Sequence, residues 1–224
     1  MPGTRVPRPS KTTRQQFVLA AMQLFAEKGY GATSIADILQ VTRAKAGSLY
    51  HLFRTKQDLL LAVLALYRDG IGPMLLEPAW KGVDDPIERI FALLDAYRRR
   101  LVDTDFFYGC PIGSLALELH EPDPPVRALL ATNFTGWTRA IERCLRAAGA
   151  RVAATVSHRE LASFVLTTME GAVMQARTHR AIATFDAAVA GLRDYFARLG
   201  YAVPRPAPRR RRRTLAPSRQ GAVR

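Results

Sequence analysis

Residues 24–60 read LFAEKGYGATSIADILQVTRAKAGSLYHLFRTKQDLL, and the signals in this stretch decide the fold. An apolar stripe at helical spacing leads into it, and Gly29 stands where that helix would end. Thr33 or Ser34 then caps a second, shorter helix. After a tight break, a third short helix is expected from about Ala44 to His51. The stretch therefore predicts a three-helix unit of the helix-turn-helix type.

The rest of the chain also repeats its apolar residues at helical spacing, and no stretch alternates as a strand would. We expect helices along most of 86–200 and a broken connector at 70–85, where glycines and prolines gather. From Pro204 onward the chain is mainly arginine and proline, a composition typical of disorder. We predict an all-α fold made of a flexible arm (1–10), a helix-turn-helix domain (11–56), a helical body (57–203) and a disordered tail (204–224).

The formal net charge of +14 is concentrated at the two ends of the chain. Residues 1–56 hold nine Lys or Arg and two acids, a balance of +7, and residues 204–224 hold eight Arg and no acid. The body between them is nearly neutral. Because a strongly basic end attracts a polyanion, double-stranded DNA is the partner we expect. The tail could add non-specific phosphate contacts or could simply be solvated.

Two segments resemble the TetR family of transcriptional regulators. The sequence LFAEKGY at 24–30, followed by ATSI at 32–35, resembles that family's first helix and the entry to its second. The sequence KAGSLYHLF at 45–53, with Lys56 after it, is similar to the family's recognition helix and its exit. The resemblance implies an N-terminal three-helix DNA-binding domain and a C-terminal helical domain for ligand binding and dimerisation. It also implies that Tyr50 and Lys56 contact phosphates.

A recognition helix must present small side chains so that its backbone can approach the base edges in the major groove. Phosphate contacts on both sides must hold it there, while Leu49 and Phe53 are expected to pin it to the core. The sequence leaves open whether Tyr50 packs instead, whether Lys56 is merely solvated, and whether His51 meets a phosphate. The residues expected at the DNA are Thr33, Ser34, Arg43, Lys45, Ala46, Gly47, Ser48, Tyr50, His51 and Lys56.

One residue departs from the family pattern in the turn before the recognition helix. Many family members have glycine there, and this chain has Arg43. If the turn is left-handed, an arginine costs on the order of 1–2 kcal/mol. Either the turn has another shape, or a contact of Arg43 in the groove offsets the cost, and we expect the contact.

The family resemblance implies that the body carries a homodimer interface and a small-molecule effector pocket. A dimer would read a palindromic operator, because each recognition helix reads only one half-site. The last two long helices are the expected interface. As candidates to line the pocket we name Leu94, Tyr97, Phe107, Tyr108, Cys110, Phe134, Trp137, Met169 and Val173, although each could be plain core.

Cys110 stands just before an expected helix start, in the sequence YGCPIG at 108–113. A helix N-terminus lowers the pKa of a thiol and makes it more reactive. A repressor that senses electrophiles or oxidants through Cys110 is therefore an alternative function. The competing interpretation is a buried, inert thiol, and it also applies to Cys144 on the apolar stripe of a long helix.

Other classes of protein find little support. No phosphate-binding loop or nucleophile with a nearby base is visible, so we expect no enzyme and no cofactor. The acidic cluster at 118–123 is expected to be a solvated loop rather than a metal site, because prolines break it. No apolar run approaches the roughly 20 residues of a membrane span, and we expect a cytoplasmic protein. An architectural DNA-binding protein without sequence preference, or an activator in place of a repressor, remains as an alternative.

Overall fold

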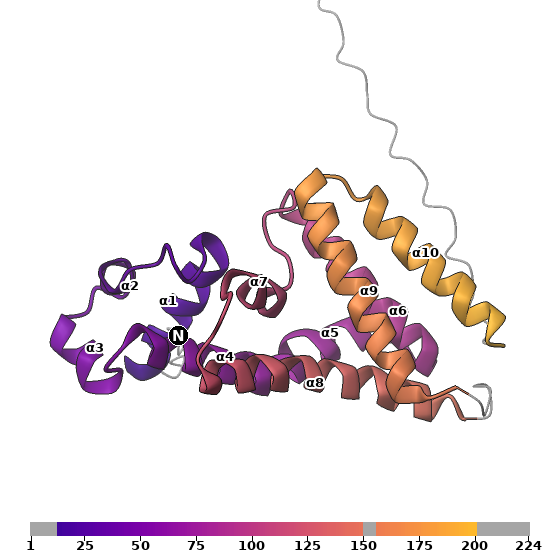
Figure 1. Ribbon diagram of the computed structural model, residues 1–224, viewed down its shortest axis with the longest axis horizontal. Coiled ribbons are helices and arrows are strands. Elements are labelled where there is room, and N and C mark those ends of the chain that lie inside the picture. Colours follow the sequence, from indigo (N-terminus) through magenta and orange to yellow (C-terminus); the bar gives the residue numbers. More distant parts are fainter. Residues whose placement is uncertain (1–12, 150–155, 201–224) are drawn as a thin grey trace, which may run out of the picture.

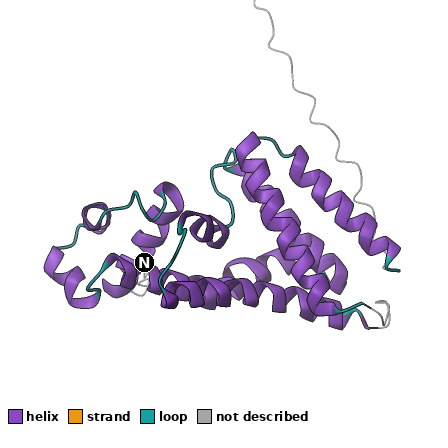
Figure 2. Cartoon of the chain, in the orientation of Figure 1, coloured by secondary structure: helices purple, strands orange, loops and turns teal. Residues whose placement is uncertain are grey.

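The computed structural model describes residues 13–149 and 156–200, so the predicted arm and tail lie outside the described residues. Within those ranges the chain forms helices and no strand, as the sequence predicts (Figure 2). The N-terminal head consists of α1 (Thr13–Lys28), α2 (Ile35–Thr42) and α3 (Ala46–Leu52). The body that follows consists of α4 (Lys56–Ile71), η1 (Gly72–Leu76), α5 (Glu77–Trp80), α6 (Pro86–Asp103), α7 (Pro111–Glu118), α8 (Pro124–Ala147), α9 (His158–His179) and α10 (Ala183–Arg198).

The head is held together by local caps and a small core. Ser34 caps α2, because its Oγ accepts a hydrogen bond from the Asp37 amide at 3.1 Å while Asp37 Oδ2 accepts from the Ser34 amide at 2.8 Å. Thr55 and Asp58 form the same reciprocal box at the start of α4. The core of the head is formed with the help of α4, and one fully buried residue comes from each of α1 to α4: Phe17, Ile38, Leu49 and Leu59. These contacts fix the angle at which α3 leaves the core.

In the body, α4 and α8 pack along each other and lead away from the head, while α6, α9 and α10 stack at the far end (Figure 1). Asn133 on α8 is buried, and its Nδ2 donates to the carbonyl oxygens of Leu64 on α4 at 3.0 Å and Leu129 at 2.9 Å. The short helix α7 lies between the head and α9 (Figure 1). The body therefore touches the head at α4 and α7 and also at Tyr108, in the loop before α7, which contacts Glu27 on α1.

The expected broken connector at 70–85 is largely wrong, because η1 and α5 continue α4 as far as Trp80. Pro73 lies inside this continuous run, and the chain takes a π-helical turn, η1, at that point. The resulting helix Lys56–Trp80 is long and apolar enough to cross a membrane by length and composition alone. The glycines and prolines within 70–80 make this run look broken in the sequence. Here α4 packs on α1 and α8, as a core helix does.

Candidate DNA-binding face and effector cavity

The face of α3 that is turned away from the core holds the predicted recognition residues, together with the exposed Leu52. Leu49 and Phe53 are buried, as predicted, and they anchor α3 to the head. Tyr50 is 51% exposed, so it is not a packed aromatic in this chain. Six further predicted residues are exposed around the turn and α3: Arg43, Lys45, Ala46, Gly47, Ser48 and His51. The helix begins at Ala46, two residues later than expected, and Lys45 is its N-cap residue without a side-chain hydrogen bond.

The turn between α2 and α3 is left-handed at Arg43, which has φ 53° and ψ 30°. The Arg43 amide donates to the Gln40 carbonyl at 3.3 Å, and the Ala44 amide donates to the Leu39 carbonyl at 3.3 Å. These two bonds close the end of α2 in the way that glycine usually allows. The conformation suspected from the sequence is therefore present, and an arginine adopts it. Open space surrounds Gly47, where an added Cβ would meet nothing within 4 Å.

Two predicted contact residues are already engaged inside the head. The side chain of Thr33 is 1% exposed, and its Oγ1 donates to the Gly29 carbonyl at 2.7 Å. The Lys56 Nζ donates to the carbonyl oxygens of Tyr30 at 2.8 Å and Thr33 at 3.0 Å, and it lies 4.3 Å from the centre of the Tyr30 ring. Ser34 remains exposed at the N-terminus of α2. Thr33 and Lys56 therefore shape the loop that presents α2.

Glu118, which the sequence analysis placed in a solvated loop, is the last residue of α7 and contacts this same loop. Its Oε2 accepts from the Tyr30 amide at 2.9 Å, and its Oε1 accepts from the Gly31 amide at 2.6 Å. Gly29 has φ 86°, and a Cβ there would lie 2.9 Å from Glu118 Oε2. The carboxylate therefore needs glycine at that position for both backbone conformation and space. Nothing in the sequence around Glu118 indicates that it contacts a loop 88 positions away.

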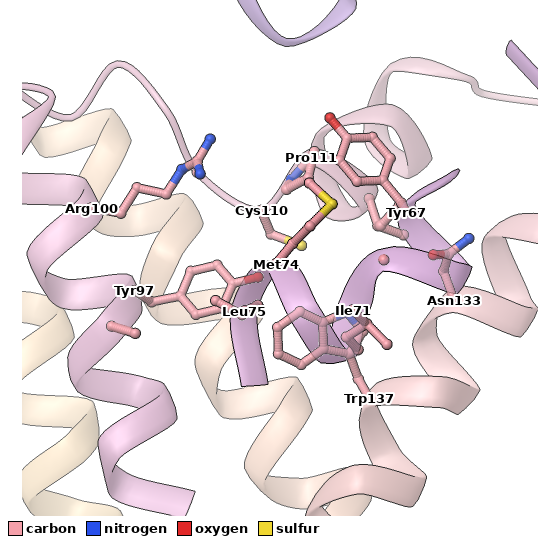
Figure 3. A pocket seen from close by; sticks show the side chains of 14 residues that line it. Tyr67, Ile71, Met74, Leu75, Tyr97, Arg100, Cys110, Pro111, Asn133 and Trp137 are labelled. Atoms are coloured by element: carbon pink, nitrogen blue, oxygen red, sulfur yellow. The ribbon is translucent and has the colours of Figure 1, made fainter. Parts of the chain in front are cut away.

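A cavity of about 110 Å³ lies where the far end of α4, η1, α6, the start of α7 and α8 meet (Figure 3). It is lined by three of the residues named from sequence, Tyr97, Cys110 and Trp137. Several other lining residues could not be named from the sequence. Tyr67 lies on the apolar stripe of α4, where it looks like plain core, and the others come from the segment expected to be a connector or from the polar side of a helix: Ile71, Met74, Leu75, Arg100 and Asn133.

A second, more open groove runs along α7, α8 and α9. Phe107, Phe134 and Val173 line it, and Cys110 separates it from the smaller cavity. The remaining predicted pocket residues line neither hollow. Leu94 and Met169 belong to the core, and the Tyr108 hydroxyl donates to Glu27 Oε1 on α1 at 3.3 Å.

Cys110 is the N-cap residue of α7, as the sequence indicates, yet its environment opposes ionisation. Its side chain is 2% exposed. Burial, with the adjacent Glu170 carboxylate adding to it, raises the pKa of the Cys110 thiol to about 12. The hydrogen bond from the Gly113 amide, at 3.5 Å to the Cys110 sulfur, acts in the opposite direction and is weaker. Of the two interpretations that the sequence leaves open for Cys110, this environment favours the buried, inert thiol over the reactive one.

Comparison with known proteins places the two halves of the chain in one family. Residues 17–63 match the model of bacterial regulatory proteins of the tetR family, and residues 86–190 match the C-terminal domain of LmrA/YxaF-like transcriptional regulators. An uncharacterised HTH-type transcriptional regulator of Mycobacterium tuberculosis is 33% identical over 178 residues, which cover 77% of this chain and 88% of the relative. The chain belongs to the TetR family. It is a helix-turn-helix transcriptional regulator of that family.

Solved structures agree with this assignment. The regulatory protein TetR from Rhodobacter sphaeroides is 25% identical, with a TM-score of 0.71 over 85% of this chain and all of that one. A cysteine mutant of the TetR family regulator CifR, complexed with a 26-bp double-strand operator DNA, is 26% identical. Its TM-score is 0.65 over 82% of this chain and 98% of that one. The chain thus shares its all-helical architecture with these structures, one of which is complexed with operator DNA.

Proposed function

We propose that this TetR-family regulator is a ligand-responsive repressor that binds a palindromic operator as a homodimer and leaves it when a small effector enters the body. The observation that carries the proposal is the position of α7. Its first turn lines the cavity at Cys110 and Pro111, and its last residue, Glu118, holds the loop before α2. A ligand that displaces one end of so short a helix would displace the other.

At the DNA, we assign base contacts to the exposed residues from Ala46 to Ser48 and phosphate contacts to Lys45, Tyr50 and His51. The backbone amides at the N-terminus of α2, beside Ser34, would bind a phosphate of the DNA half-site that α3 reads. Arg43 is exposed next to α3 and would reach into the groove. Lys56 and Thr33 would act indirectly, by holding the loop before α2 in place.

The homodimer interface is assigned to α9 and α10, as the sequence analysis expects. Support comes from apolar side chains that α9 and α10 leave exposed. Phe164 and Tyr195 are 49% and 43% exposed, and their rings meet edge to face at 5.5 Å. Met174 is exposed on the same helix as Phe164. Covering them with a second copy would remove apolar area from water and set two heads at a fixed spacing.

Release would follow from the coupling between the cavity and the head. An effector that moves the turn at Cys110 would draw Glu118 away from the amides of Tyr30 and Gly31. The loop before α2 would then lose its acceptor, and the two recognition helices would lose their spacing on successive major grooves. Couplings of this kind are worth about 1–3 kcal/mol, which corresponds to a roughly 5- to 150-fold change in operator affinity. Since its target is chromosomal DNA, we place the protein in the cytoplasm.

The test begins with selection of bound DNA from a random pool by the full chain, followed by sedimentation of the protein alone and with the selected site. The proposal expects a palindrome with half-sites about one helical turn apart, bound by two copies of the chain. Recovery of DNA without a preferred palindrome would favour the architectural alternative. A stable monomer on and off DNA would contradict the dimer.

Two alternatives from the sequence analysis keep distinct tests. A thiol-based sensor is favoured only by the position of Cys110 in the wall of the cavity, while its raised pKa opposes reaction at neutral pH. Operator release by an electrophile that persists in Cys110→Ser would exclude it. Activation would be indicated by a selected site upstream of a promoter and by transcription that falls when the gene is deleted.

A further inference from the structure

The smaller cavity has a wall without negative charge. None of the 14 described residues that line it is Asp or Glu, and most are apolar or aromatic. Trp137, Ile71 and Leu75 form its inner part, and the Tyr97 ring lies 5.6 Å from the Trp137 ring (Figure 3). The volume of about 110 Å³ is somewhat less than that of a cavity of roughly 150 Å³ that binds benzene. The cavity therefore suits a small, compact apolar group.

Arg100 stands at the edge of this cavity with no acid to neutralise it. The two arginines before it on α6 are both paired, Arg98 with Asp186 at 2.6 Å and Arg99 with Asp95. Arg100 has only a ring beneath it, with the guanidinium carbon 5.2 Å from the centre of the Tyr108 ring. Among the described residues it has no hydrogen-bond acceptor and no ion pair. A guanidinium kept free in this way can receive an anion bidentately.

A second donor stands across the cavity from Arg100. Figure 3 shows Tyr67 and Arg100 flanking the cavity, with Met74 between them. Burial raises the pKa of the Tyr67 phenol to about 12, so the hydroxyl keeps its proton at neutral pH and can donate it. In the described part of the chain that hydroxyl has no hydrogen-bond partner. Met74 is 52% exposed, and its flexible thioether can move aside for a ligand.

We propose that this cavity binds a compact carboxylate, with its apolar body against Trp137 and its carboxylate between Arg100 and Tyr67. The charge favours the class: the exposed guanidinium of Arg100 attracts a carboxylate, gains no ion pair from a neutral ligand and repels a cation. The volume decides the size: the body is about that of a benzene ring or a branched four-carbon group. The proposal rests on the proposed function in taking this cavity as the effector site.

Calorimetric titration of the full chain with benzoate and isovalerate, beside the neutral benzamide and isovaleramide, tests the class of ligand. At least one carboxylate should bind roughly tenfold or more tightly than its amide, as expected for hydrogen bonds to a charged group. The variant Arg100→Gln should abolish that preference. The matched variant Arg99→Gln, on the same helix but paired with Asp95 and absent from the cavity wall, should retain it. Tyr67→Phe should weaken carboxylate binding by a smaller factor.

Equal binding of acid and amide, or a preference that survives Arg100→Gln, would overturn the proposal. Thermal unfolding of each variant checks that loss of binding is not loss of the fold. The proposed function is read separately, from operator release. Carboxylates that bind through Arg100 without releasing the operator would leave the ligand class standing and contradict ligand-responsive repression. Operator release by a neutral compound, with no binding of carboxylates, would support ligand-responsive repression and contradict the proposed ligand class.

Discussion

Glu118 and Lys56 hold the same loop through opposite ends of its peptide groups. The Glu118 carboxylate accepts from the amides of Tyr30 and Gly31, and the Lys56 ammonium donates to the carbonyl oxygens of Tyr30 and Thr33. Each of the two side chains belongs to a helix whose other end lines the cavity, α7 in one case and α4 in the other. The loop before α2 is thus the place where both routes from the cavity reach the head.

Glu118→Ala should lower the free energy of unfolding by about 1–2 kcal/mol, because two backbone amides lose a charged acceptor at a site partly open to water. Operator affinity should fall with it, since the loop before α2 is no longer held. An effector identified in operator-release assays should add little further loss. Urea unfolding and fluorescence anisotropy with labelled operator measure the two effects.

Glu121→Ala is the control for that variant. Glu121 is three residues along the chain and, among the described residues, pairs only with Arg127, in a bridge where Arg127 is 57% and Glu121 79% exposed. Its loss should change stability and affinity little, because exposed ion pairs contribute little. If the variants at Glu118 and Glu121 behave alike, the link between α7 and the head carries no coupling.

Lys56→Met should weaken operator binding without changing its dependence on salt. The methionine keeps an apolar stem beside the Tyr30 ring but cannot donate to the loop. A residue that contacts a phosphate would instead lower the slope of log affinity against log salt by about one. We expect that lower slope for Lys45→Met, because Lys45 is exposed at the start of α3. A reduced slope in Lys56→Met would restore Lys56 to the phosphate contacts predicted from sequence.

Arg43→Gly should raise the free energy of unfolding by up to about 1 kcal/mol, because it removes a side chain from a left-handed turn. Operator affinity should nevertheless fall, because the guanidinium contact in the groove is lost. Arg43→Asn separates the two effects, since asparagine tolerates the left-handed conformation and carries no charge. Unchanged affinity in both variants would mean that Arg43 makes no contact with DNA.

Much of the head could be predicted from the sequence because its signals are local. The caps at Ser34 and Thr55 and the apolar pins at Leu49 and Phe53 depend on residues within one or two helical turns. The left-handed turn at Arg43 could be suspected for the same reason. Local signals also misled in one case, because Pro73 was taken as a break when a π-helical turn accommodates it.

The cavity and the contact of Glu118 with the loop before α2 could not be predicted, because both depend on residues far apart in the chain. Glu118 meets Tyr30 across 88 positions, and nothing beside either residue announces the other. Cys110 shows the same limit in its chemistry. Its place before a helix left a reactive thiol and a buried, inert thiol both open. Burial and the approach of Glu170 from α9 raise its pKa and favour the inert thiol.

Glu170→Gln should stabilise the protein at neutral pH. Burial raises the pKa of the Glu170 carboxyl above its ordinary 4.5, and its Oε1 is a buried oxygen without a hydrogen-bond partner among the described residues. Folding therefore favours the protonated form, and ionisation costs stability. The wild-type melting temperature should accordingly fall as the pH rises from below 4.5 through the raised pKa of Glu170, because the carboxyl becomes ionised. The Glu170→Gln variant has no such group and should not show this fall.

The exposed Glu160 in the first turn of α9 supplies the control, because Glu160→Gln removes a charge that favours the helix N-terminus and should bring no gain. The same Glu170→Gln variant should lower the pKa of the Cys110 thiol somewhat, while burial keeps it above the ordinary value. Alkylation of Cys110 by a small maleimide at pH 7 should then be slow in the wild type and faster in the variant. Rapid alkylation of the wild type, with loss of operator binding, would support the thiol sensor instead.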